Sequence, residues 1–305
     1  MGIYTDLALE ARELNPQIDG VTEETESFGD IVITRIGVTS PDAAEKLGKR
    51  MGRYVTLDAP ALIDRPLDLF AEAAQRLGKE LEIMLGGLGS IRSLLVVGLG
   101  NRAVTPDSLG PKTAGKTFVT RHVKQYMPEA FANGVPSVAS VAPGVLGSTG
   151  VETSEIIKGV IERIRPDAVI AVDSLASRRA SRISTTIQIS DAGIDPGSGV
   201  GNIRAGLNSD SLGIPVIAIG VPLVVHASTI TQDTISLMAD ETGLHGDEEK
   251  LKALAEKVVS ERMDGMIVTP KDIDSIVADM SGIISEGINR ALFGGHYEEV
   301  RSLIA

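Results

Sequence analysis

The sequence of 305 residues contains no cysteine and no tryptophan, and aromatic residues make up only 3% of it. The absence of cysteine excludes disulfide bonds, thiolate metal sites and a cysteine nucleophile. The scarcity of aromatic residues argues against a surface that stacks nucleic-acid bases. The apolar content comes instead from Val, Ile, Leu and Ala, a composition typical of buried parallel strands.

Basic residues are outnumbered, because 29 Lys and Arg face 41 Asp and Glu, for a formal charge of -12. Since a phosphate-binding surface is normally basic, we expect no nucleic-acid partner. No apolar run approaches the roughly 20 residues that span a bilayer. The amino terminus also lacks the basic segment and apolar core of a signal peptide. We therefore expect a cytoplasmic protein without a membrane partner.

Apolar runs and helical periodicity predict the α/β class, with a central, mostly parallel sheet flanked by helices and with added β segments. Strands buried on both faces are predicted within residues 93–101, 136–144, 167–176 and 214–222. Ser40 is a candidate N-cap with Pro41 at the first helical position, and residues 66–85 have the periodicity of an amphipathic helix. The β-helix-β order places the carboxyl ends of the parallel strands on one edge, where ligands bind.

The preferred domain count is one, spanning residues 1–305. Within it we expect an extended, polar amino-terminal arm at 1–29, an α/β core at 30–243 and a helical region at 244–305.

The stretch GLGNRAVTPDSLGP, residues 98–111, has two interpretations. Gly98, Gly100 and Ala103 match a dinucleotide-binding fingerprint, but Pro106 and Pro111 lie where the first turns of its helix should run. No acidic residue follows at the distance expected for a ribose contact. The glycines are then better explained as room for a close approach of the chain, and the stretch would serve to present a carboxylate.

That carboxylate is Asp107, and a second one, Asp173, ends the apolar run AVIAVD. Both are predicted at the edge formed by the strand ends. An acid beside apolar strands is costly unless it is paired, hydrogen-bonded or protonated, and such acids can perform acid-base chemistry. The alternatives are that Asp107 is an N-cap and that Asp173 is a turn residue. Their joint placement favours the catalytic interpretation.

Several long motifs together resemble the germination proteases of spore-forming bacteria. They are VVGLGN, VTPDSLGP, APGVLGSTGVETSEII, DAVIAVDSLASR, TTIQISDAGIDPGSGVGN and LGIPVIAIGVP, with GRYVTL and VTPKDID nearer the two ends. The resemblance implies an endopeptidase that degrades small acid-soluble spore proteins during germination. It also implies a zymogen, a homotetramer, and a fold similar to that of hydrogenase maturation proteases.

The same resemblance implies that Asp107 and Asp173 are the catalytic pair, a location that agrees with the interpretation of the residues above. Family substrates are cut after an acidic residue and before a bulky apolar residue followed by Ala, and TDLA at residues 5–8 fits that pattern. Our hypothesis is a processing site between Asp6 and Leu7, which makes residues 1–6 a short propeptide. The alternative is a helix start capped by Thr5.

The sequence alone leaves two other functions open. A dinucleotide-dependent enzyme and a non-catalytic relative of the fold are the competing classes. No cofactor is expected, although two aspartates and a loop carbonyl could also hold a divalent metal ion.

Overall fold

The protein is described by a computed structural model that covers residues 5–131, 133–195, 206–242, 250, 251, 253, 254, 257, 258 and 265–304. Within these residues, nine strands form one sheet in the order β1-β2-β3-β7-β8-β6-β4-β5, and β9 pairs with β8 beside this path. The strands are β1 (Val21–Phe28), β2 (Ile31–Val38), β3 (Gly52–Asp58), β4 (Ser93–Gly98), β5 (Ser137–Val141), β6 (Ala168–Ser177), β7 (Thr186–Ser190), β8 (Val216–His226) and β9 (Ile267–Val268).

The sheet has a parallel half and an antiparallel half. β5, β4, β6 and β8 are parallel neighbours, and they correspond to the four apolar runs of the sequence. β1, β2, β3 and β7 form an antiparallel extension that joins the parallel half at β8. The predicted α/β class is confirmed, and the antiparallel strands are its added β segments.

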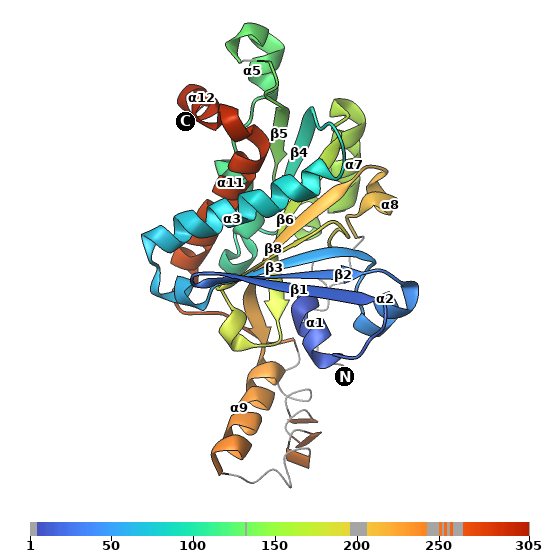
Figure 1. Cartoon of the computed structure of the whole chain (residues 1–305), viewed down its shortest axis with the longest axis vertical. Coiled ribbons are helices and arrows are strands. Elements are labelled where there is room, and N and C mark those ends of the chain that lie inside the picture. Colours follow the sequence, from blue (N-terminus) through green and yellow to red (C-terminus); the bar gives the residue numbers. More distant parts are fainter. Residues whose placement is uncertain are drawn as a thin grey trace.

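Helices lie on both faces of this sheet (Figure 1). They are α1 (Ala8–Leu14), α2 (Pro41–Leu47), α3 (Leu67–Gly86), α4 (Leu109–Lys116), α5 (Arg121–Tyr126), α6 (Leu146–Thr149), α7 (Thr153–Ile164), α8 (Ser209–Leu212), α9 (Ala227–Thr242), α11 (Ile273–Phe293) and α12 (Tyr297–Ile304). α2 begins as predicted, because the Ser40 hydroxyl accepts the N–H of Ala43 at 3.2 Å. It ends at Gly48, which has a left-handed φ of 61°.

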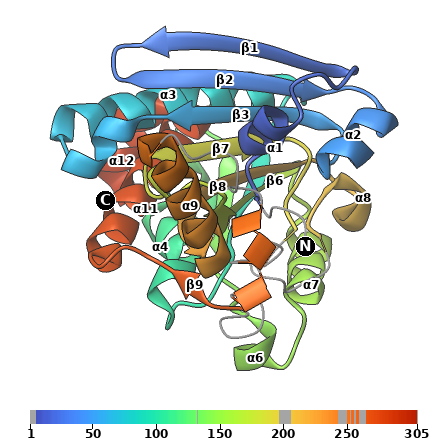
Figure 2. The same cartoon turned by 90° about the horizontal axis from the view of Figure 1, so that it is seen from below.

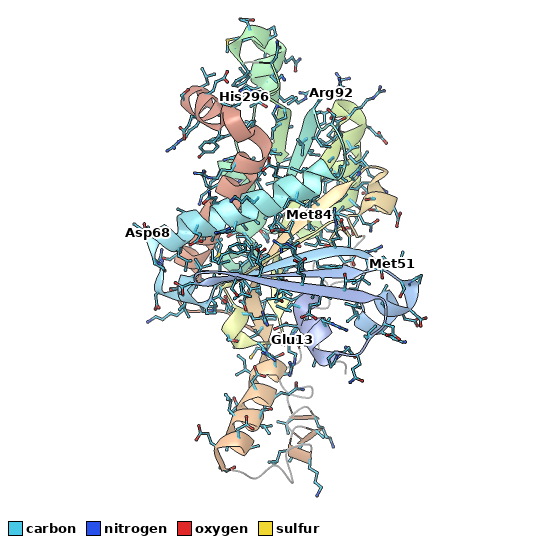
Figure 3. The ribbon with its side chains drawn as sticks, in the orientation of Figure 1. Glu13, Met51, Asp68, Met84, Arg92 and His296 are labelled. Carbon is cyan, nitrogen blue, oxygen red and sulfur yellow. The ribbon has the colours of Figure 1, made fainter. Side chains whose placement is uncertain are left out.

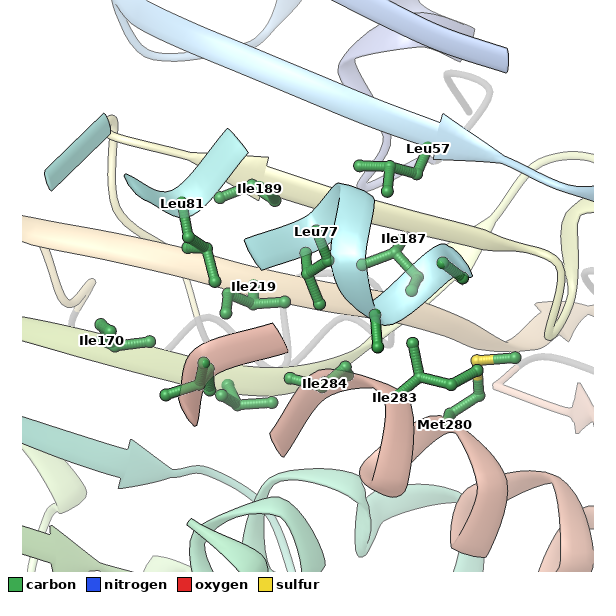
Figure 4. Close-up of a cluster of buried hydrophobic side chains, with 14 of the residues drawn as sticks. Leu57, Leu77, Leu81, Ile170, Ile187, Ile189, Ile219, Met280, Ile283 and Ile284 are labelled. Atoms are coloured by element: carbon green, nitrogen blue, oxygen red, sulfur yellow. The ribbon is translucent and has the colours of Figure 1, made fainter. Parts of the chain in front are cut away.

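α3 and α11 cover one face and build the main core with the odd-numbered side chains of β7 and β8 and the even-numbered ones of β6 (Figure 4). The two helices approach closely because glycines meet at their contact. A Cβ on Gly78 would lie 3.1 Å from the carbonyl oxygen of Gly287. The fully buried side chains include Leu77, Leu81, Ile170, Ile189, Ile219 and Ile284.

The opposite face is covered by α1 and α2 over the antiparallel half and by α7 and α8 over the parallel half (Figure 2). Glu13 on α1 and Met84 on α3, both labelled in Figure 3, mark the two sides of the sheet. α9 projects away from the body of the molecule (Figure 1).

The expectation of an extended polar arm at residues 1–29 was wrong for its described part. α1 packs on the sheet, with Leu7, Ala8 and Leu9 buried, and β1 is the edge strand of the sheet. The sequence misleads here because the polar residue Glu10 is also buried, as an acceptor for the backbone N–H groups of Arg178 and Arg179. The carboxyl-terminal region is likewise more than a helical tail, since β9 extends the sheet and α11 forms part of the core.

Candidate functional site

The candidate site lies where β4 ends and its neighbour β6 continues. β4 stops at Gly98, which is level with Val172 of β6, and the next residue, Leu99, donates its N–H to the carbonyl of Val172 at 2.8 Å. β6 runs on to Ser177 because β8 still pairs with its other edge. Beyond Val172, the edge of β6 that faced β4 is therefore no longer covered by that strand.

Asp173 lies in the interior of β6, opposite Gly220 of β8, so its placement at the strand end was wrong. The strand ends at Ser177, one residue beyond the predicted range 167–176, although Asp disfavours strands and interrupts the apolar run. Asp173 is only 4% exposed, and its Oδ1 accepts the N–H of Ser174 at 2.8 Å. Asp173 is therefore not a turn residue, because it lies within a regular strand.

Asp107 lies in a short 3₁₀ turn, η2 (Thr105–Asp107), directly before α4. Its Oδ2 accepts the N–H of Asn101 at 2.8 Å, in the loop that follows β4. The N-cap position of α4 belongs to Ser108, so Asp107 is not the capping residue of that helix. Gly100, with φ of 109°, allows the turn to come close, because a Cβ there would lie 2.0 Å from the carbonyl oxygen of Asp107.

Two glycines, Gly98 and Gly110, allow α4 to pack directly against the strand ends. A Cβ on Gly98 would lie 2.1 Å from the carbonyl oxygen of Gly110, and a Cβ on Gly110 would lie 2.4 Å from that of Val172. The prediction that the glycines serve a close chain approach is confirmed. The fingerprint alternative fails, because α4 begins only at Leu109 and not within the glycine motif.

The structure thus brings the segments of both predicted aspartates to one place. η2 contacts β6, and Thr105 of η2 donates its hydroxyl to Asp274 of α11 at 3.0 Å. The assignment of Asp107 and Asp173 as a catalytic pair stays a prediction.

The predicted processing site, Asp6 and Leu7, lies on the same edge of β6. The N–H of Asp6 donates to the carbonyl of Ala176 at 3.0 Å, and the N–H of Ala176 donates to Oδ2 of Asp6 at 2.8 Å. Leu7 is completely buried. The N-cap position of α1 belongs to Leu7, while Thr5 accepts the N–H of Leu7 at 3.1 Å and bonds to Glu10.

A cavity of about 1080 Å³ opens beside this segment. Polar groups of five elements or loops line it, and they include Thr5, Asp6, Lys49, Tyr54, Gln188 and Asp195. Burial lowers the pKa of Lys49, although Asp6, Glu10 and Asp195 act in the opposite direction. Burial also raises the pKa of Tyr54 above its ordinary value.

Sequence reasoning missed Lys49 and Gln188 as members of this site. Lys49 follows α2 in an ordinary polar stretch, and no motif marks it. Gln188 carried a weak signal, because it is a buried amide in the middle of the strand TIQIS. A buried amide must find hydrogen-bond partners, and here they come from the amino-terminal segment.

Among the described residues, no three or more His, Asp and Glu side chains are grouped so that they could hold a metal ion. In the same part of the chain, no helix has the length and apolar character required to cross a membrane.

Comparison with known proteins places this arrangement in a family. The family model described as germination protease matches residues 3–245. The germination protease of Caldanaerobacter subterraneus subsp. tengcongensis is 45% identical over 98% of this chain and 97% of its own length. That of Clostridium perfringens is 44% identical over 95% of both chains, and that of Bacillus subtilis is 39% identical over 95% of this chain and 93% of its own.

Among solved structures, a NiFe hydrogenase maturation protease, HycI from Thermococcus kodakarensis, is 17% identical with a TM-score of 0.31, over 58% of this chain and 97% of its own. The family model and the curated relatives, by contrast, each match most of the chain. The chain belongs to the germination protease family.

Proposed function

We propose that the chain is an endopeptidase that starts the degradation of small acid-soluble spore proteins during germination, and that Asp107 and Asp173 activate the attacking water. One observation carries the proposal. The carboxylate of Asp173 accepts the N–H of Ser174 on the part of β6 that β4 does not cover. The turn that carries Asp107 packs beside this part of β6, because Gly98, Gly100 and Gly110 allow a close approach.

Two carboxylates held close together tend to share one proton, because both cannot ionise easily. The ionised one accepts a proton from water, and the resulting hydroxide attacks the scissile carbonyl carbon. The protonated one donates a hydrogen bond to the carbonyl oxygen and stabilises the charge that develops there. The amine then leaves with a proton from the pair. The pair titrates as a unit, so the two roles belong to the dyad and not to a single residue.

The proposal includes a zymogen that is cleaved between Asp6 and Leu7. The support is the placement of this bond on the edge of β6, close in sequence along that strand to Asp173. Because Leu7 is buried and Asp6 is held by Ala176, the segment fills the edge that a substrate would need. Removal of residues 1–6 would free that edge.

The proposal also includes assembly into a homotetramer in the cytoplasm of the spore core. The support is α9, which projects from the body of the molecule (Figure 1), and the neighbouring segment at β9. Both carry large apolar side chains that are exposed to solvent. Leu237 and Met238 are 64% and 61% exposed, and Met266 is 53% exposed. Exposed apolar groups that are gathered on a projection are typical of an interface between copies.

The test is incubation of the purified and fully processed chain with a small acid-soluble spore protein, followed by mass spectrometry of the products. We expect Asp107→Asn and Asp173→Asn each to reduce cleavage by about 10³-fold or more. Asp68→Asn, an exposed residue at the start of α3, is the matched control and should cleave normally. Normal cleavage by either variant would remove that residue from the pair, and no cleavage by the parent chain would favour a non-catalytic relative.

A further inference from the structure

The edge of β6 beyond the end of β4 is suited to receive a peptide. In a parallel strand, alternate residues direct their N–H and C=O groups toward the same neighbour. Val172 faces the side of β4, as its bond from Leu99 shows, so Ser174 and Ala176 face that side too. β8 occupies the other edge as far as Ser177. A segment that binds to Ala176 therefore takes the place that β4 has left.

Asp6 takes this place with two bonds of different kinds. Its backbone N–H donates to the carbonyl of Ala176, as in an added strand. Its side-chain carboxylate, and not its backbone carbonyl, accepts the N–H of Ala176 at 2.8 Å. A short side chain with an oxygen acceptor thus supplies, in this segment, the bond that a backbone carbonyl supplies in an ordinary added strand.

The charge of that acceptor is matched by Lys49. The ammonium group of Lys49 donates to the carbonyl of Thr5 at 2.9 Å, and its electrostatic partners include the carboxylate of Asp6. Burial lowers the pKa of Lys49, so a carboxylate beside it stabilises its charged form. An uncharged amide in place of the carboxylate would lose this attraction while keeping the bond from Ala176.

The contacts that follow Asp6 use the backbone of the bound segment. Gln188 accepts the N–H of Ala8 with Oε1 at 2.7 Å and donates from Nε2 to the carbonyl of Asp6 at 3.3 Å. Leu7, between them, is completely buried. The groove therefore binds an acidic residue followed by a large apolar one. Any peptide with these two residues in this order can make the same contacts.

We propose that Ala176, Lys49 and Gln188 form a substrate subsite that selects an acidic residue followed by a large apolar one, and that residues 5–8 occupy it in this structure. Lys49 supplies the selectivity for charge, Ala176 fixes the carboxylate, and Gln188 fixes the backbone on either side of the apolar residue. The proposal rests on the endopeptidase function proposed above, which it deepens by assigning residues to specificity.

The experiment uses the processed chain and compares two peptides that differ only in an Asp-Leu-Ala or Asn-Leu-Ala sequence at the cleaved bond. We expect the parent to prefer the Asp peptide in kcat/KM, and Lys49→Met to reduce that preference by about tenfold, mainly through KM. Lys49→Arg should restore most of it, because the charge returns. Lys46→Met on α2, an exposed lysine of the same region, is the control that should keep the parent's preference. An unchanged preference in Lys49→Met would overturn the proposal.

A binding measurement separates this inference from the proposed activity. In the Asp6→Ala chain the segment loses both its carboxylate and the acceptor for the N–H of Ala176, and we measure the fluorescence anisotropy of labelled Asp-Leu-Ala and Asn-Leu-Ala peptides. Tighter binding of the Asp peptide, lost on adding Lys49→Met, supports the subsite even if the chain cleaves neither peptide. Equal affinity for both peptides overturns the subsite even if the chain is an active protease.

Discussion

Gly98 at the end of β4 and Gly110 in α4 are in backbone contact, since a Cβ on Gly98 would lie 2.1 Å from the carbonyl oxygen of Gly110. A Cβ on Gly110 would in turn lie 2.3 Å from the carbonyl oxygen of Leu99. The contact leaves no room for a side chain on either residue, and it determines how close the turn carrying Asp107 comes to β6.

Gly110→Ala should therefore destabilise the chain, because backbone and not a flexible side chain would have to move. We expect a loss of about 1–3 kcal/mol in the free energy of unfolding, the usual cost of overpacking. The measurement is the urea midpoint. Gly115→Ala in the same helix is the matched control, because a Cβ there meets nothing within 4 Å. It should be neutral or slightly stabilising, since Ala is the better helix former. Equal midpoints for the two variants would contradict the close contact.

The buried carboxylate of Glu10 should be necessary for holding the amino-terminal segment. It accepts the N–H groups of Arg178 and Arg179 at 2.7 and 2.9 Å and lies 3.5 Å from the guanidinium of Arg182. Glu10→Gln replaces one acceptor oxygen with a donor, and we expect a loss of about 1–3 kcal/mol in stability. Cleavage of the chain between Asp6 and Leu7 should become faster, as followed by mass spectrometry.

The control for this change is Glu24→Gln on the exposed edge strand β1. It should alter neither the stability nor the rate of processing. A Glu10→Gln chain that is destabilised but processed at the parental rate would show that release of the segment does not limit processing.

Stability at high pH should fall because of Tyr297. Burial, with the hydrogen bond that its hydroxyl donates to Glu286, raises the pKa of Tyr297 to about 12 from its ordinary value of 10.0. Between pH 10 and about 12 the unfolded chain loses the tyrosine proton while the folded chain keeps it. The folded state then binds more protons, so the contribution of Tyr297 is fully present below pH 10 and decreases above it.

Tyr297→Phe should remove this contribution. The difference in free energy of unfolding between the parent and Tyr297→Phe, measured by urea titration, should be constant below pH 10 and shrink between pH 10 and 12. A difference that stays constant to pH 12 would contradict the assigned pKa.

Exhaustive chelation should leave the proteolytic rate unchanged, because the proposed dyad generates its nucleophile from water without a bound cation. The measurement is the initial rate of substrate cleavage before and after treatment with EDTA, with the chelator then removed. A lost rate that magnesium or manganese restores would replace the dyad mechanism with a metal-assisted one.

The sequence predicted the elements whose stability is local or generic. The cap at Ser40 and the four buried strands follow from residue types and periodicity alone. The interior position of Asp173 in β6 was not predicted, because the pairing beyond it depends on β8, a partner that lies far along the chain. The packing of α1 on the sheet was missed because the burial of Glu10 depends on backbone amides after β6.

In the candidate site too, residues marked by local sequence were predicted and residues that depend on distant partners were not. Asp107 and Asp173 could be selected because each stands next to a feature that sequence shows, a proline turn or an apolar run. Lys49 and Gln188 could not, because their significance comes only from the segment at residues 5–8 that lies between them. Periodicity describes one element at a time, and this groove is built by three.

The packing of α11 against α3 through Gly78 and Gly287 has a consequence for biosynthesis. The helix that completes this face of the sheet, α11, lies far along the chain from its partner α3. During translation this face therefore stays open until α11 has left the ribosome. The packed core that supports the edge of β6 cannot be completed before that point.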